Sequence, residues 1–403
     1  MNNTTKKTRE PLFHLVKRAN VPAWQAWAIR AGTIIAGFIV IGLLALAMLK
    51  INPFDMYGYM FKGTFGFSGK EEADHLNRMM LLYNMALLLL VALAVTPAFK
   101  MKFWNIGAEG QVLMGALSCM LCMHYFGGKI GNGGLIAICF ASALIGGMLW
   151  AVIPALFKAK WNTNETLFTL MMNYVAIQLI VYITKVWEPM GTGSLTPSAY
   201  GQLPRIAGEN FWLTIIVAVL MTAVMFVYLR YSKHGYEISV VGESENTARY
   251  IGINVRKVII RTLIFSGVLC GLVGFLQVAG FDYTVSDTTA GGRGFTAILV
   301  SWLAKFNPIM MIFTAFLVVF LERGMGEVMT QANVYNSFFS GVVTGIMFLA
   351  IIGCEFFINY KIVFRHRAAV SAPPAPLPPI GAAPEELHDA LDPEVASKPA
   401  KEE

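Results

Sequence analysis

Long apolar runs constrain this chain more than any other feature of its sequence. Residues 31–49, 79–99 and 135–157 each hold about as many consecutive apolar residues as a helix needs to cross a bilayer, roughly 18–20. Charged residues make up only 14% of the chain, against about a quarter in soluble domains. The sequence therefore predicts an all-α polytopic membrane protein.

We predict ten membrane-spanning segments. They cover residues 31–49, 79–99, 105–126, 135–157, 165–184, 211–228, 262–279, 294–304, 308–321 and 337–359. The eighth and ninth are too short for ordinary spans. They are either two short or re-entrant helices, or one helix kinked at Pro308. With ten spans, far more Lys and Arg residues lie on the side that holds both termini, and the positive-inside rule makes that side cytoplasmic.

The sequence predicts that the chain has three parts. Residues 1–30 mix basic residues with Trp24 and Trp27, which indicates a cytoplasmic or interfacial segment. Residues 31–360 form the transmembrane domain, and residues 361–403 form a cytoplasmic tail whose Pro/Ala-rich, then acidic composition predicts disorder. The stretch before the first apolar run is too long for a cleavable signal peptide.

A weak internal symmetry relates the second to fifth spans to the seventh to tenth. Each half has a second member interrupted by glycine, in residues 105–110 (NIGAEG) and 290–294 (AGGRG). The first half begins by running inward and the second by running outward, so the halves would be inverted repeats. Broken helices at matching positions of two such halves indicate a substrate path.

No set of residues for catalysis or metal binding is present in the sequence. The nearest approach to a P-loop, residues 63–71, has one residue too many and lacks the Ser or Thr after Lys70. Cys119 and Cys122 form a lone C-x-x-C within an apolar run, where small buried residues are the better interpretation than a metal site. We predict that the chain is not an enzyme, binds no cofactor and does not hydrolyse ATP itself. Its net charge of +7 reflects basic loops near an anionic membrane surface rather than a nucleic-acid site.

Polar residues within or beside the apolar runs are the candidates for a substrate pathway. They are Asn105, Glu109, Gln111, Asn164, Glu165 and Asn173. Asn105 and Glu109 are four residues apart, so we expect them on one helix face. A charge at the bilayer centre costs roughly 2.5–3.5 kcal/mol, so Glu109 should serve a pathway or helix packing. Asn164 could instead cap a helix, and Glu165 could stabilise its dipole.

A polar, basic loop at residues 229–261 separates two apolar runs. Residues 243–250 are good helix formers and Gly252 is a natural helix stop, which predicts a short helix outside the bilayer. Such a short helix is marginal alone and needs a surface to pack against. The alternative is a basic loop that only follows the positive-inside rule.

Three segments carry a resemblance to a known family. Residues 242–253 (GESENTARYIGI) resemble the coupling-loop motif of ABC importer permeases, residues 103–111 (FWNIGAEGQ) resemble a signature of those that import nucleosides and simple sugars, and residues 292–298 (GRGFTAI) recur there. The resemblance implies that a helix with Gly242, Glu243, Asn246, Ala248, Arg249 and Gly252 docks on an ATPase subunit. It also implies a second permease subunit, alike or homologous, an extracytoplasmic substrate-binding lipoprotein and a bacterial inner-membrane location.

The resemblance leaves the substrate and several roles open. Nucleosides are the favoured solutes, with ribose-like sugars or branched-chain amino acids as alternatives, and an ion-coupled secondary transporter as the alternative of another class. Phe281, Asp282, Tyr283 and Arg293 are expected at the outer mouth. They could receive a binding protein or only form a solvated loop. The aromatic rings could stack on a base or belong to an interfacial belt.

Overall fold

The computed structural model describes residues 13–18, 22–67, 69–188, 191, 193–331 and 338–364. Two parts of the chain form separate units. One is a pair of antiparallel strands, β1 (Phe13–Lys17) and β2 (Tyr360–Phe364), in which Phe13 lies opposite Phe364. The sequence predicted an interfacial segment and no strand here, because the pairing joins residues from opposite ends of the chain. The other unit is helical.

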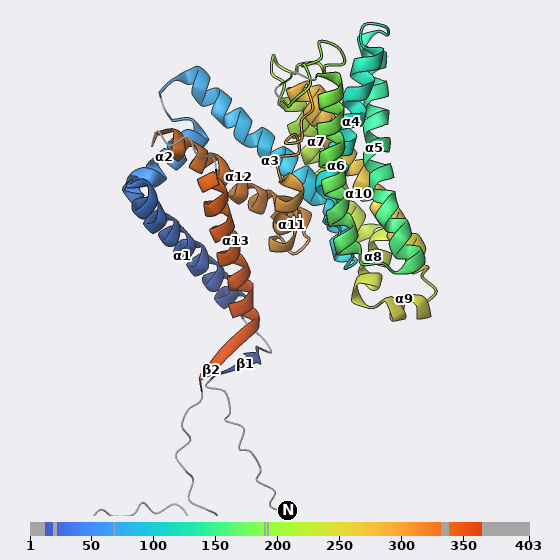
Figure 1. Ribbon diagram of the computed structural model, residues 1–403. Coiled ribbons are helices and arrows are strands. Elements are labelled where there is room, and N and C mark those ends of the chain that lie inside the picture. The colour runs from blue at the N-terminus through green and yellow to red at the C-terminus, as the bar shows by residue number, and fades with distance from the viewer. Residues whose placement is uncertain are drawn as a thin grey trace, which may run out of the picture. The chain divides into compact units, whose positions relative to one another are not determined.

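The helical unit confirms the predicted all-α membrane fold (Figure 1). Its elements are α1 (Ala23–Leu49), α2 (Pro53–Phe65), α3 (Glu71–Lys100), α4 (Ala108–Phe126), α5 (Asn132–Trp161), α6 (Glu165–Trp187), α7 (Trp212–Tyr231), α8 (Lys233–Glu243), α9 (Glu245–Tyr250), α10 (Val255–Gln277), the π-helix η1 (Val278–Asp282), α11 (Arg293–Leu303), α12 (Pro308–Gln331) and α13 (Phe338–Asn359). Among the described residues, eight helices are long and apolar enough to cross a membrane: α1, α3, α5, α6, α7, α10 with η1, α12 and α13. The chain is thus a multi-pass membrane protein, and the count of ten spans stays a prediction.

Residues 294–321 form two separate helices, so the single kinked helix is wrong. Lys305 and Phe306 both have a positive φ, and this turn reverses the chain between α11 and α12. Helix α12 also continues to Gln331, ten residues past the predicted end at residue 321. The apolar run stops at Glu322 and Arg323, but neither residue breaks a helix.

Residues 50–78, between the first two predicted spans, are largely helical. Asn52 caps α2 by accepting a hydrogen bond from Phe54 N at 3.1 Å, and Pro53 takes the first helical position, where its missing N–H costs nothing. Met56 and Met60 of α2 pack in a cluster with Met325 of α12. Helix α2 was not predicted, because its apolar stripe is short and interrupted by Asp55, Gly58 and Lys62.

Glycines let α4, α5 and α10 approach one another closely. A Cβ added at Gly271 of α10 would lie 2.3 Å from the Ala143 oxygen of α5, and one added at Gly115 of α4 would lie 2.6 Å from the Gly271 Cα. Small residues at such contacts are a main route to helix association in membranes, where burial of apolar surface gives no driving force between helices. This packing fixes α4, the helix that carries Glu109 and Gln111.

We expect Gly271→Ala to destabilise the helical unit, because the new methyl group forces α5 and α10 apart. Overpacking a well-packed interior costs typically about 1–3 kcal/mol. The measurement is thermal unfolding of the purified protein in detergent. Gly345→Ala on α13 is the matched control, since a Cβ there meets nothing within 4 Å. Equal unfolding temperatures for the two variants would contradict the close packing.

Candidate functional site

The first turns of α4 and α11 meet inside the helical unit. The Glu109 carboxylate, on α4, accepts hydrogen bonds from Gly292 N and Gly294 N, each at 2.7 Å. A Cβ added at Gly294 would lie 2.3 Å from the Glu109 nitrogen, so only glycine permits this approach. One carboxylate therefore stabilises the positive ends of two helix dipoles. Two glycine-rich motifs far apart in the sequence form a single junction, here called the α4–α11 junction.

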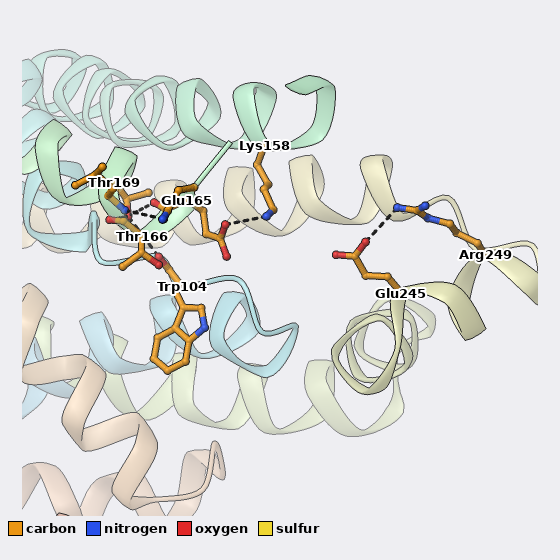
Figure 2. A network of polar contacts seen from close by, with 9 residues as sticks. Trp104, Lys158, Glu165, Thr166, Thr169, Glu245 and Arg249 are labelled. Atoms are coloured by element: carbon orange, nitrogen blue, oxygen red, sulfur yellow. Dashed lines mark hydrogen bonds and ion pairs between the residues drawn. The ribbon is translucent and has the colours of Figure 1, made fainter. Parts of the chain in front are cut away.

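Helix α6 supports the first turn of α4 and the non-helical segment that precedes it. Asn173 accepts a hydrogen bond from Gly110 N at 2.9 Å and donates one to the Ile106 oxygen at 2.9 Å. The Thr169 hydroxyl accepts from Ile106 N at 3.2 Å and lies beside Trp104 (Figure 2). Buried main-chain groups need such partners, since an unpaired one costs about 1–3 kcal/mol. Thr169 was not among the predicted site residues, because a Thr in an apolar run gives no signal of its own.

Asn105 and Gln111 complete the support of the α4–α11 junction. Asn105 lies before α4 begins, so the expected helix face shared with Glu109 is wrong. Its side-chain oxygen instead accepts from Gly107 N at 3.1 Å and from Gln111 Nε2 at 3.2 Å, and its nitrogen donates to Ser266 Oγ at 3.3 Å. Asn105, Glu109, Gln111 and Asn173 are all buried. Contact with a solute would need movement of the helices around them.

Asn164 and Glu165 lie apart from that junction, at the start of α6. Asn164 is exposed and caps the helix by accepting from Leu167 N at 3.1 Å. Glu165 pairs with Lys158 at the end of α5, with 2.8 Å between the charged atoms (Figure 2). Of the two interpretations that the sequence left open, the geometry supports the structural one for both residues.

The predicted outer-mouth residues divide into two groups. Phe281 packs in an aromatic cluster, with ring centroids 4.9 Å from Tyr83 and 5.4 Å from Phe211. Tyr283 ends the π-helix in the left-handed conformation, with φ 55°. Asp282 accepts a hydrogen bond from Gln277 at 3.0 Å. In this arrangement Phe281 is a packing residue, and stacking on a base stays a prediction.

Arg293 begins α11 and is bonded to α3, and its predicted place at the outer mouth stays a prediction. Its guanidinium donates to the Asn84 side-chain oxygen at 2.9 Å and approaches the carbonyl oxygens of Thr289 and Ala290 at 3.5 Å. Asn84 is near the middle of α3, beside which α11 packs (Figure 1). Asn84 was not among the predicted site residues, although a lone Asn in the apolar run 79–99 was a visible signal.

Residues 232–254 form two short helices rather than the predicted one. Ser232, Ser244 and Asn254 cap α8, α9 and α10 through hydrogen bonds from backbone N–H groups at 2.9, 3.3 and 3.2 Å. Glu243 ends α8 and so does not belong to the helix that follows. Gly252 has φ +85° and ends the turn after α9, as the sequence predicted.

The two faces of this segment differ in burial. Gly242 and Ala248 are buried, and a Cβ added at Gly242 would lie 2.2 Å from the Lys100 oxygen at the end of α3. Glu243, Asn246 and Arg249 point outward, and Tyr250 is 92% exposed. Arg249 pairs with Glu245 at 3.1 Å (Figure 2), but an exposed pair of this kind adds little stability. Helix α9 is thus held by α8 and α10, α8 in turn packs on α3, and α9 presents an aromatic side chain on its outer face.

A half-buried hydrogen-bonded corner joins α7, α8 and α10. His234 bonds to the Tyr228 hydroxyl through Nδ1, and Nε2 lies 3.4 Å from the Thr262 hydroxyl. Burial lowers the pKa of His234 to about 4. The imidazole therefore stays neutral at physiological pH, and the corner keeps the same hydrogen bonds across that range.

Comparisons with known proteins find permease proteins similar to this chain. A family model described as "Branched-chain amino acid transport system / permease component" matches residues 77–352. The glucose ABC transporter permease protein TsgB13 of Haloferax volcanii is 28% identical over 366 residues, which cover 87% of this chain and 93% of that protein. The guanosine ABC transporter permease protein NupP of Bacillus subtilis is 31% identical over 244 residues, 59% of this chain and 70% of that protein. The nucleoside ABC transporter permease protein NupB of Lactococcus lactis is 25% identical over 342 residues, 80% and 85% of the two chains.

Proposed function

Since this chain belongs to the family of branched-chain amino acid transport system permease components, we propose that it is the membrane-spanning subunit of an ABC importer for nucleosides. Two of the relatives named above carry guanosine or nucleoside in their names. In this proposal the chain forms the solute path together with a second permease subunit. A partner ATPase hydrolyses ATP, an extracytoplasmic lipoprotein delivers the solute, and both termini lie in the cytoplasm.

The exposed outer face of α9 is the observation that carries this proposal. Tyr250 is 92% exposed and Ile251 is 50% exposed, although α9 itself is anchored to the helical unit through Ala248. Tyrosine is enriched at the centres of protein interfaces because it gives a large contact area with few rotatable bonds. We infer that Tyr250 and Ile251 dock in the ATPase, and that α9 passes the movement of the ATPase to α3 and α10. This is rigid-body coupling between two states of the transporter.

A sugar is the second candidate solute, because the glucose permease relative aligns over 93% of its length. Competition for uptake separates the candidates. Cells that make this chain from its native locus should take up labelled guanosine. Unlabelled adenosine should compete with it, whereas glucose, ribose and leucine should not. Deletion of the chain should abolish the uptake. Uptake of glucose or leucine, but not guanosine, that depends on the chain would contradict the nucleoside assignment.

A further inference from the structure

A polar pocket lies among α3, α11 and α12. Asn84, Arg293, Thr296 and Glu322 contribute its polar lining, and its volume is ≈ 70 Å³. That volume has room for a few water molecules, since a single water needs roughly 10–15 Å³ on the same measure. The pocket therefore fits the edge of a small polar group and not a whole nucleoside.

The pocket lies well within the membrane-spanning part of these helices. Glu322 follows the first residue of α12 by 14 positions, or about 21 Å at ~1.5 Å per residue. Asn84 precedes the last residue of α3 by 16 positions, or about 24 Å on the same rise. Both distances start at helix ends next to basic residues, Lys305 and Lys100. A hydrocarbon core is about 30 Å thick, so the pocket is at membrane depth.

The Glu322 carboxylate is open to the outside of the helical unit. Glu322 is exposed, and its side chain makes no hydrogen bond or ion pair with any residue in the described part of the chain. Its main-chain oxygen accepts from Ser340 Oγ at 3.2 Å, which ties this turn of α12 to α13. A carboxylate at this depth is too costly to face lipid tails, so it faces water or a polar solute.

We propose that Glu322, Arg293 and Asn84 bind the vicinal hydroxyl groups of a pentose ring as the solute crosses the membrane. This inference rests on the proposed function. A carboxylate has two oxygens that can accept from two neighbouring hydroxyls, and a guanidinium donates to hydroxyl oxygens in return. Asn84 and two carbonyl oxygens already orient Arg293, so little freedom is lost on binding.

The rest of the solute lies outside the pocket, on the open side of Glu322. Only the hydroxyl edge enters, which suits nucleosides that differ in their bases. Free sugars carry the same hydroxyl groups, so the site by itself does not discriminate between nucleosides and free sugars. A site built to bond a hydroxyl strongly rejects an analogue that lacks it, because its polar groups are then left unpaired.

The test compares uptake of labelled guanosine and 2′,3′-dideoxyguanosine by cells that make Glu322→Gln or the unchanged chain. Unchanged cells should favour guanosine by at least about tenfold. Glu322→Gln should lower guanosine uptake about tenfold through KM and bring the ratio of the two substrates close to one, because charged hydrogen bonds are the stronger ones. Glu327→Gln on the same helix is the control, and it should keep both the rate and the ratio. The binding protein that delivers the solute is the same in every strain. Its own preference between the two nucleosides therefore cancels when the uptake ratios of the strains are compared.

The possible failures are distinguishable. A Glu322→Gln chain present at normal level that lowers uptake of both nucleosides equally, or of neither, overturns the hydroxyl site while leaving nucleoside import intact. Labelled ribose is the second arm of the test. Uptake of ribose but not guanosine, with the same sensitivity to Glu322→Gln, contradicts the proposed function and supports the hydroxyl site.

Discussion

Tyr250→Ala combined with Ile251→Ala is expected to abolish ATP-driven uptake while leaving the permease folded. Tyr250 is 92% exposed and Ile251 is 50% exposed, so their removal should cost little stability. Truncation of an interface hot spot costs about 2 kcal/mol or more, which is roughly a thirtyfold loss of affinity. The ATPase should therefore no longer copurify with the double variant, and uptake should fall with it.

Tyr182→Ala is the matched control for this prediction. Tyr182 is 66% exposed on α6, far from the α9 segment along the chain. Its loss should change neither copurification of the ATPase nor uptake. Normal uptake by the Tyr250/Ile251 double variant would contradict the coupling role of α9. If the double variant and Tyr182→Ala lost uptake and ATPase copurification equally, the loss would not be specific to α9.

Glu109→Ala is expected to lower uptake at least about tenfold and to reduce thermal stability. The variant leaves the N–H groups of Gly292 and Gly294 without their acceptor, and each unpaired group costs about 1–3 kcal/mol. The first turn of α11 would then lose its attachment to α4. Glu109→Gln should be intermediate, because its amide keeps one acceptor oxygen. Uptake and thermal unfolding of the purified protein measure the two effects.

Glu165→Gln is the control for the charge at Glu109. Glu165 pairs with Lys158 near the end of α5, and the two side chains are only 14% and 19% exposed, so this variant also removes the charge of a covered carboxylate but does so away from the α4–α11 junction. If the Glu109→Ala variant kept the uptake rate and the unfolding temperature of the unchanged chain, the α4–α11 junction would have no role in transport or stability. If Glu165→Gln lowered uptake as much as Glu109→Ala, the effect would not be specific to the α4–α11 junction.

The sequence predicted most of the fold because membrane helices depend on local composition. The apolar runs identified the spanning helices, and the motif resemblance to ABC importer permeases is confirmed by the comparisons. The strand pair β1–β2 was not predictable in this way. It pairs Phe13 with Phe364, and the sequence of neither segment indicates that the other is its partner.

Helix boundaries and side-chain roles were less predictable, since they depend on contacts between distant segments. The run that ends at residue 321 gave no sign that α12 continues, because charged residues can extend a helix beyond its apolar part. Glu109 was selected for its depth, but its partners Gly292 and Gly294 could be found only in the folded chain. Glu322 was missed because it lies just past an apolar run and resembles the start of a loop.

The most direct test of the account is solute accumulation in reconstituted vesicles. Vesicles that hold the complete importer, with this chain, the second permease subunit, the ATPase and the binding protein, should accumulate labelled guanosine only when ATP is supplied on the side of α9. Vesicles that hold this chain alone should accumulate nothing under a proton or sodium gradient. Accumulation by the chain alone, driven by an ion gradient without ATP, would contradict the claim that a partner ATPase moves it.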